Sequence, residues 1–182
     1  MKGIVFHLFQ ASICKHHGED AWDDILEEAG VEGAYTSLGT YADDELYALV
    51  NAASRRIDRP PTEVVRWFAA EAADVFAERF PAFFAPHSTV RTFLLALNDI
   101  IHPEVKKLYP EAETPSFTFE TAADGRLVMH YHSRRQLCAF GEGLILGSAR
   151  HFGERATVEQ PRCVHRGDDH CVLVVGIEPA GS

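Results

Sequence analysis

The segment Leu127-Val128-Met129-His130-Tyr131-His132-Ser133-Arg134-Arg135 combines a strand pattern with polar side chains at one end. Side chains alternate between the two faces of a strand, so one face would carry Leu127, Met129, Tyr131, Ser133 and Arg135. A guanidinium pairs with a carboxylate through two parallel hydrogen bonds, and the two hydroxyls can add more. This face suits a ligand with an apolar body and an anionic end. The same spacing also fits an edge strand whose last residues point to solvent.

The rest of the second half predicts a small, mostly antiparallel sheet. Phe117 and Phe119 alternate with polar residues, and Asp124-Gly125 indicates a hairpin turn before residues 127–132. A helix is expected over 136–152, ending at Gly153. Two further strands are expected over 157–160 and 171–177.

The first half predicts helices, because apolar residues recur at helical spacing over 22–29, 46–53, 64–76 and 93–101. Gly30 fits a helix C-cap, and Thr62 and Ser88 fit N-caps. The last of these helices is expected to end near His102, because a proline disfavours the α conformation of the residue before it. Helices followed by strands predict one α+β domain over 1–182, with a helical part over about 1–110 packed on a sheet-containing part over about 111–182.

Composition excludes several function classes. The chain has 182 residues with 27 acidic and 17 basic side chains, and the net charge of −10 argues against nucleic-acid and anionic-membrane partners. No apolar run reaches membrane-spanning length, and the N-terminus does not fit a signal peptide. A cytoplasmic protein is therefore expected, in which four cysteines are thiols or metal ligands rather than disulfides.

No sequence motif predicts an enzyme. There is no Walker loop, no Gly-x-Ser-x-Gly elbow and no His-Glu-x-x-His helix. The segment Gly141-Glu142-Gly143-Leu144-Ile145-Leu146-Gly147 is only faintly like a dinucleotide fingerprint, since its third glycine comes one residue late. Small residues that let this helix closely approach the sheet or a bound cofactor explain it better.

His102 lies at the apolar end of a predicted helix, beside Ile100 and Ile101. One imidazole projecting from such a helix is the arrangement of a proximal haem ligand. A histidine favoured by the helix dipole is the simpler alternative. The anion-pairing face that ends at Arg135 favours the haem interpretation, because haem also carries two propionates.

With these residues the chain resembles the H-NOX family, the haem-nitric oxide/oxygen binding domains related to the sensor domain of soluble guanylate cyclase. The resemblance covers essentially the whole chain and rests on Met1-Lys2-Gly3-Ile4, Trp22, Leu97-Asn98-Asp99-Ile100-Ile101-His102, Leu108-Tyr109-Pro110 and the Tyr131-Ser133-Arg135 motif. It implies a haem b buried between the helices and the sheet. His102 would be the proximal iron ligand, Pro115 would press on the porphyrin, and the propionates would bind Tyr131, Ser133 and Arg135.

The resemblance also bears on which gas is bound. Oxygen-binding members place a distal tyrosine where this chain has Phe140, and the other expected pocket residues, Val5, Phe9 and Leu144, are apolar. A pocket without a hydrogen-bond donor should bind nitric oxide and carbon monoxide and hold oxygen poorly. The expected function is a nitric oxide sensor in which ligand binding weakens the bond between iron and His102. The expected partner is a separate signalling protein, such as a histidine kinase or a cyclic di-GMP enzyme.

Three cysteines, Cys138, Cys163 and Cys171, form a second candidate site for tetrahedral zinc. Related bacterial proteins complete such a site with a histidine three residues before the middle cysteine, where this chain has Gln160. Either His165 or His170 substitutes, or the site is weakened, or it works as a thiol switch. The alternative function is therefore a zinc- and cysteine-based redox sensor in which haem is secondary.

The remaining histidines and Cys14 receive no role. His16-His17 and His130-x-His132 could bind a metal ion adventitiously, although solvated side chains are the simpler interpretation.

Overall fold

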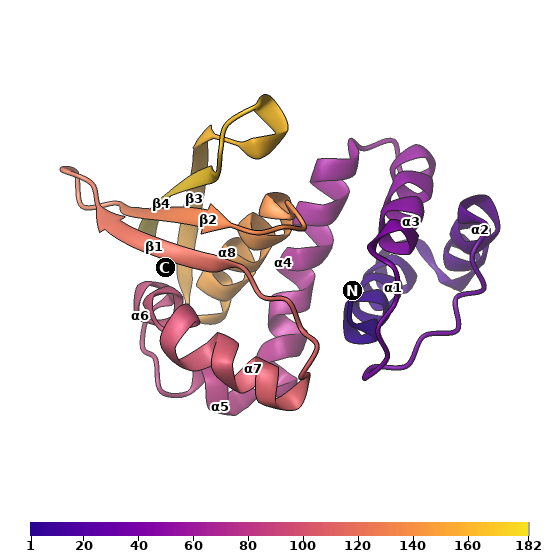
Figure 1. The fold of residues 1–182 in the computed structure, drawn as a ribbon, viewed down its shortest axis with the longest axis horizontal. Coiled ribbons are helices and arrows are strands. Elements are labelled where there is room, and N and C mark those ends of the chain that lie inside the picture. The colour runs from indigo at the N-terminus through magenta and orange to yellow at the C-terminus, as the bar shows by residue number, and fades with distance from the viewer. Residues whose placement is uncertain (182) are drawn as a thin grey trace.

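The structure, a computed structural model, describes residues 1–181 and confirms the α+β prediction. Within these residues, eight α-helices accompany one four-stranded sheet (Figure 1). The helices are α1 (Gly3–His17), α2 (Glu19–Ala29), α3 (Asp43–Arg56), α4 (Pro61–Arg79), α5 (Pro81–Phe84), α6 (Val90–Leu95), α7 (His102–Leu108) and α8 (Cys138–His151). The strands are β1 (Ser116–Thr121), β2 (Leu127–His132), β3 (Glu154–Arg162) and β4 (Cys171–Pro179). None of the helices over 1–181 is both long enough and apolar enough to cross a membrane.

The sheet has the strand order β1-β2-β4-β3, and every neighbouring pair is antiparallel. The hairpin predicted at Asp124-Gly125 connects β1 to β2, with Gly125 at φ 85°. Leu127, Met129 and Tyr131 are all buried, so the face predicted for the first three residues of the motif is confirmed. This face of the sheet is directed into the protein, and the alternate side chains of β2 lie on its opposite face.

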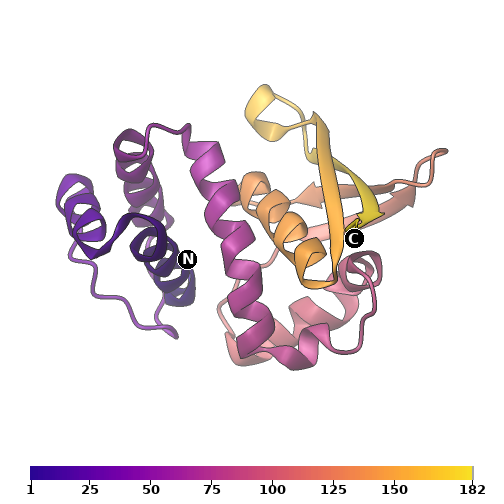
Figure 2. The ribbon, with the colours of Figure 1, turned by 180° about the vertical axis from the view of Figure 1, so that it is seen from behind.

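The backbones of α4 and α8 touch, because α8 has glycine at the two points of contact. A Cβ atom on Gly143 would lie 2.2 Å from the carbonyl oxygen of Arg66, and one on Gly147 would lie 2.2 Å from that of Ala70. The small residues of this segment do permit a close approach, but to α4 rather than to the sheet or a cofactor as the sequence analysis expected. Figure 2 shows α4 running through the middle of the molecule, with α1–α3 on one side and α8 with the sheet on the other.

Two hydrophobic cores meet along α4. The first contains the buried side chains of α1, α2, α3 and the first half of α4, up to Ala72. The second begins at Ala77 and contains buried side chains of α5, α6, α8 and the sheet. The division between the cores therefore falls within α4, whereas the sequence placed a boundary near residue 110.

The helix expected to end near His102 continues beyond it, so that part of the prediction is wrong. A π-helical turn, Leu97–Ile101, connects directly to α7, and the backbone amides of Ile101 and His102 bond to carbonyls five residues earlier, those of Ala96 and Leu97. Pro103 cannot donate a backbone hydrogen bond, and its ring would clash with the carbonyl four residues earlier in an α-helix. The wider turn just before it avoids that clash, and π-turns of this kind occur frequently at functional sites.

The caps were predicted in part. Gly30 ends α2 in the left-handed conformation, as expected. The cap of α6 is Thr89 rather than Ser88, since the Thr89 side chain accepts a hydrogen bond from the amide of Thr92. Pro60 precedes α4 in place of Thr62, because Pro61 already has the backbone angle of a first helical residue.

Alanine substitutions at the glycines of α8 test the contact with α4. Gly143→Ala and Gly147→Ala should each lower the free energy of unfolding by about 1–3 kcal/mol, because the added methyl group overlaps backbone atoms. Gly141→Ala is the matched control, since its Cβ would lie 3.6 Å from the Tyr131 ring, an ordinary contact. The control should leave stability unchanged or raise it by up to about 1 kcal/mol through helix propensity. Equal urea midpoints for all three variants would contradict the packing argument.

Candidate functional site

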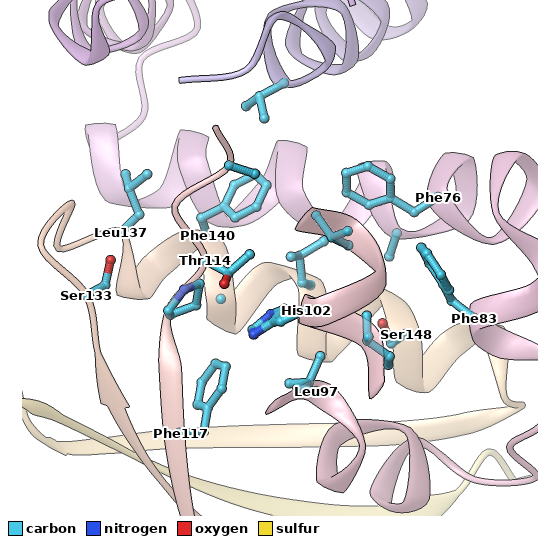
Figure 3. Close-up of a pocket in the computed structure, with 18 of the residues that line it drawn as sticks. Phe76, Phe83, Leu97, His102, Thr114, Phe117, Ser133, Leu137, Phe140 and Ser148 are labelled. Atoms are coloured by element: carbon cyan, nitrogen blue, oxygen red, sulfur yellow. The ribbon is translucent and has the colours of Figure 1, made fainter. Parts of the chain in front are cut away.

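An apolar cavity of about 280 Å³ lies in the second core, next to α4. Helix α8 and the start of α1 supply one wall, and α6, the π-helical turn, α7 and the inner face of the sheet supply the others (Figure 3). Three phenylalanines, Phe76, Phe80 and Phe83, line one end of the cavity. Such a cavity suits a flat, mainly hydrophobic ligand.

His102 projects into this cavity from the junction of the π-helical turn and α7 (Figure 3). Burial lowers the pKa of its imidazole to about 4, the positive charge of Lys106 acts in the same direction, and the carbonyl of Pro115 opposes them. The ring is therefore neutral at pH 7. Its buried Nδ1 atom has no hydrogen-bond partner among the described residues. A neutral imidazole facing an apolar cavity is the form that coordinates a metal ion.

Asn98 fixes the position of the π-helical turn against the sheet. Its Nδ2 donates to the carbonyl of Phe117 at 2.6 Å, and its Oδ1 accepts from the amide of Phe117 at 3.1 Å. The His102 and Phe117 rings lie at an interplanar angle of 30°, with centroids 5.9 Å apart. Asn98 belongs to the segment that carried the family resemblance, but the sequence gave no reason to assign it this structural role.

The polar rim of the cavity contains the three residues of the motif, Tyr131, Ser133 and Arg135. Strand β2 ends at His132, so Ser133 and Arg135 lie in the following turn rather than on the strand face where the alternation placed them. Burial raises the pKa of Tyr131 to about 12, although a hydrogen bond with Ser133 opposes this, so the phenol keeps its proton. The rim thus offers two hydroxyls and a guanidinium.

Asp43, in the first turn of α3, binds Arg135 across the rim. The Nε atom of Arg135 donates to Asp43 Oδ2 at 2.8 Å, and its Nη1 donates to the carbonyl of Glu113 at 3.0 Å. The amino group of Met1 contacts the other oxygen of Asp43 at 2.6 Å. Burial favours the protonated acid, but these two cations outweigh it and hold the pKa of Asp43 below its usual range. The rim is therefore connected to the N-terminal helices through an ion pair.

Val5, Phe140 and Leu144 line the cavity with apolar side chains. Pro115 lines it too, and its carbonyl interacts with the His102 imidazole. Phe9 does not line it: this ring packs in the first core, edge-on to Trp22 and 4.9 Å from the ring of Phe68.

Sequence reasoning missed several lining residues, among them Phe76, Phe80, Phe83, Thr114 and Ser148. Ser148 could have been found, since it follows Leu144 by four residues on the same helix and so shares its face. The phenylalanines were recognised only in part, because helical spacing marks Phe76 as buried without saying that it faces a cavity.

Cys138, Cys163 and Cys171 come together as the sequence predicted. All three are buried, and their sulfur atoms lie within 4.8 Å of one another. Cys163 Sγ is 3.8 Å from Cys138 Sγ and 3.9 Å from Cys171 Sγ. Two sulfurs bound to one zinc ion at about 2.3 Å in tetrahedral geometry lie about 3.8 Å apart, so the spacing fits a metal ion.

Neither candidate histidine completes this cluster. His165 Nε2 lies 2.8 Å from the carbonyl of Gln136, and His170 Nε2 lies 3.0 Å from His130 Nδ1. Gln160 lies beside Cys138, where its amide favours the thiolate. Burial nevertheless raises the pKa of Cys138, and it raises that of Cys171 to about 12. Without a metal ion, both therefore remain protonated at neutral pH.

Comparison with known proteins agrees with this geometry. Residues 2–160 match the model of the haem-NO-binding family. A soluble guanylate cyclase of Caenorhabditis elegans, gcy-35, is 27% identical over 172 residues, which are 87% of this chain and 24% of the relative. The chain thus spans about a quarter of the length of that relative.

Solved H-NOX structures have the same fold. The H-NOX protein of Shewanella oneidensis in the Fe(II)NO state superposes with a TM-score of 0.91 at 29% identity, over 98% of this chain and 99% of the other. The H-NOX of Shewanella woodyi in the Fe(II)CO state is 32% identical, with a TM-score of 0.83 over 100% of this chain and 97% of the other. The family match, the whole-chain similarity and the cavity around His102 lead to one conclusion: this chain belongs to the haem-NO-binding (H-NOX) family of haem-based gas sensors.

Proposed function

We propose that this protein is a nitric oxide sensor that holds haem b in the cavity, with His102 as the axial ligand. The observation that carries the proposal is the neutral, buried imidazole, which faces an apolar cavity whose rim bears Tyr131, Ser133 and Arg135. Two carboxylates at the rim would receive hydrogen bonds from both hydroxyls and from the guanidinium. The apolar walls would exclude water from the porphyrin faces.

Ferrous haem held by His102 would supply the gas chemistry: it would bind nitric oxide or carbon monoxide, and nitric oxide would weaken its bond to the imidazole. The chain decides which gas is retained. Val5, Phe140 and Leu144 offer no donor to stabilise the partial negative charge of bound oxygen. Ser148 also lines the cavity and has a hydroxyl group. It lies two helical turns from Phe140, about 12 Å along the helix axis, and so supplies no donor beside Phe140.

Release of His102 would transmit the signal. The imidazole lies where the π-helical turn meets α7, and Asn98 holds that turn on β1. If the imidazole were released, α7 would be free to move while the turn stays attached to the sheet through Asn98, and Pro115, which lines the cavity, would be the residue positioned to press on the bound group. The ion pair between Asp43 and Arg135 connects the rim to the N-terminal helices. The ligand thereby biases a two-state element, and a separate protein such as a histidine kinase or a cyclic di-GMP enzyme would read it in the cytoplasm.

Removal of the axial imidazole tests the ligand assignment. His102→Gly should change the absorption spectrum of the unliganded ferrous protein, and added imidazole should restore the original spectrum by occupying the vacated space. His87→Gly is the control, since His87 is outside the set of cavity-lining residues, and its spectrum should match the original. A His102→Gly variant with an unchanged ferrous spectrum would show that another residue binds the iron.

Gas selectivity is tested by substitution of Phe140, with Phe83 as the control position. The ferrous protein should form no stable oxygen complex in air. Addition of nitric oxide should produce the absorption spectrum of a five-coordinate nitrosyl haem, in which the imidazole is no longer bound to iron. Phe140→Tyr adds a donor and should allow a stable oxygen complex. Phe83→Tyr adds the same hydroxyl at the far end of the cavity (Figure 3) and should not. A stable oxygen complex of the original protein would contradict the proposal.

We further propose that Cys138, Cys163 and Cys171 bind one structural zinc ion as thiolates, with the fourth position filled by a group other than histidine. The sulfur spacing supports this, and zinc would supply the positive charge that buried thiolates need. A thiol switch without bound zinc fits less well. The raised pKa values of Cys138 and Cys171 leave little thiolate to react with an oxidant.

Metal analysis tests the zinc proposal. Protein purified under reducing conditions should contain about one zinc ion per chain, and Cys163→Ser should lose it, because only two thiolates remain. Cys14→Ser should keep the metal, since Cys14 lies on α1 outside the cluster. Reduced protein that contains no zinc and forms a reversible disulfide would favour the redox function instead.

A further inference from the structure

Three histidine rings gather on the outer face of the sheet, opposite the cavity. His130 and His132 are two residues apart on β2, and the register that pairs Tyr131 with Cys171 places His132 across from His170. The His170 ring lies 4.8 Å from the His132 ring and 5.2 Å from the His130 ring, centroid to centroid. Only two of these residues form a sequence pattern, so the cluster could not be recognised before the strands were paired.

A carboxylate lies beside the outer nitrogen of each ring in the pair His130 and His170. Asp169 Oδ1 lies 2.9 Å from His170 Nδ1, and Glu120 Oε1 lies 3.4 Å from His130 Nε2. Asp169 favours the His170 tautomer whose proton is on Nδ1, so His170 Nε2 accepts a hydrogen bond from His130 Nδ1 at 3.0 Å. In that state His130 Nε2 is buried without a hydrogen-bond partner among residues 1–181.

The proton on His130 Nδ1 leaves the Nε2 lone pair of the same ring directed toward the carboxylate of Glu120, without a partner in the described part of the chain. A metal ion in place of that proton would accept the lone pairs of both His130 Nδ1 and His170 Nε2. His130 would then carry its proton on Nε2, toward Glu120. This carboxylate–histidine–metal pattern orients ligands in many metalloproteins.

We propose that His130, His132 and His170 form a surface binding site for a late divalent transition metal ion such as Zn²⁺ or Ni²⁺. With metal–nitrogen distances of about 2.1 Å, the imidazole centroids around a tetrahedral ion lie roughly 5 Å apart, which matches the two measured separations. His130 and His170 need a small tilt, and His132 must turn from its stacked position to direct a nitrogen at the ion. Imidazole ligands select this class of metal over Mg²⁺ and Ca²⁺, which prefer oxygen.

The site is open to solvent. His132 and His170 line a shallow hollow of about 610 Å³, together with Asp169. The same hollow contains Lys106, Arg134 and Glu113, so together with Asp169 its two positive and two negative side chains balance and would not concentrate cations by themselves. The imidazoles, rather than the electrostatic field, would therefore provide the affinity.

An ion at this position would connect β2 to the loop before β4. That loop runs from Cys163 to His170, the last residue before the strand. The adjacent Cys171 is buried in the cysteine cluster on the other face. The surface site is therefore distinct from the cysteine cluster but fixes the same loop.

Nuclear magnetic resonance of the histidine rings tests the proposal. The ferrous protein saturated with carbon monoxide is diamagnetic, so ¹⁵N-histidine resonances can be followed while Zn²⁺ is added to reduced protein that already holds one equivalent. We expect ring nitrogens of His130, His132 and His170 to shift together and saturate at one further equivalent. Mg²⁺ should produce no shift.

Substitutions assign the ligands. His130→Gln and His170→Gln should each weaken this second binding step at least tenfold, and His17→Gln, on α1, should leave it unchanged. An unchanged carbon monoxide spectrum verifies that each variant is folded. The proposal is overturned if zinc shifts only His16 and His17, if it binds at the cysteines alone, or if His170→Gln binds as tightly as the original protein.

Discussion

The backbone contact between α4 and α8 is the constraint on which the rest of the structure depends. Gly143 and Gly147 let the two helices approach until a methyl group no longer fits between them. The first half of α4 belongs to one core and its end to the other, so this contact joins two separately packed halves. The same placement directs Phe140, Leu144 and Ser148 of α8 into the cavity.

The site combines an apolar interior with polar groups that are confined to its rim. Inside, burial keeps the His102 imidazole neutral, because a charged imidazole would be unfavourable among phenylalanine side chains. At the rim, Arg135 is already bound by Asp43 and by the carbonyl of Glu113, so its guanidinium is ordered. An anionic group that enters the cavity meets a preorganised donor, although it must share that donor with Asp43.

Much of the fold could be predicted because local patterns determine it. The Asp124-Gly125 turn and the alternation over 127–131 identified the hairpin, and helical periodicity identified most of the helices. Pro103 misled the prediction, since a proline after a widened turn does not end the helix. The spacing of the motif was right, but the strand ended before Ser133, and no local pattern reports where a neighbouring strand stops pairing.

The site was predictable where one residue type dictates one chemistry. His102 and the three cysteines lie where their chemistry required, in a cavity and in a buried cluster. Phe9 was misplaced because an apolar residue fits a core and a cavity wall equally well. His170 could not be paired with His130 before the register between β2 and β4 was known, since long-range pairing leaves no trace in a single sequence.

The π-helical turn before His102 has a consequence for the ancestry of the chain. A π-turn contains one residue more than the α-turn it replaces, so the segment Leu97–Ile101 corresponds to a single-residue insertion into an α-helix. Each residue of an α-helix turns the chain by about 100°, so deleting one residue here would leave the helix continuous but rotate His102 away from the cavity. A change in the length of this turn would separate the histidine from the site, so the number of residues matters here in addition to the identity of Asn98, which holds the turn on β1.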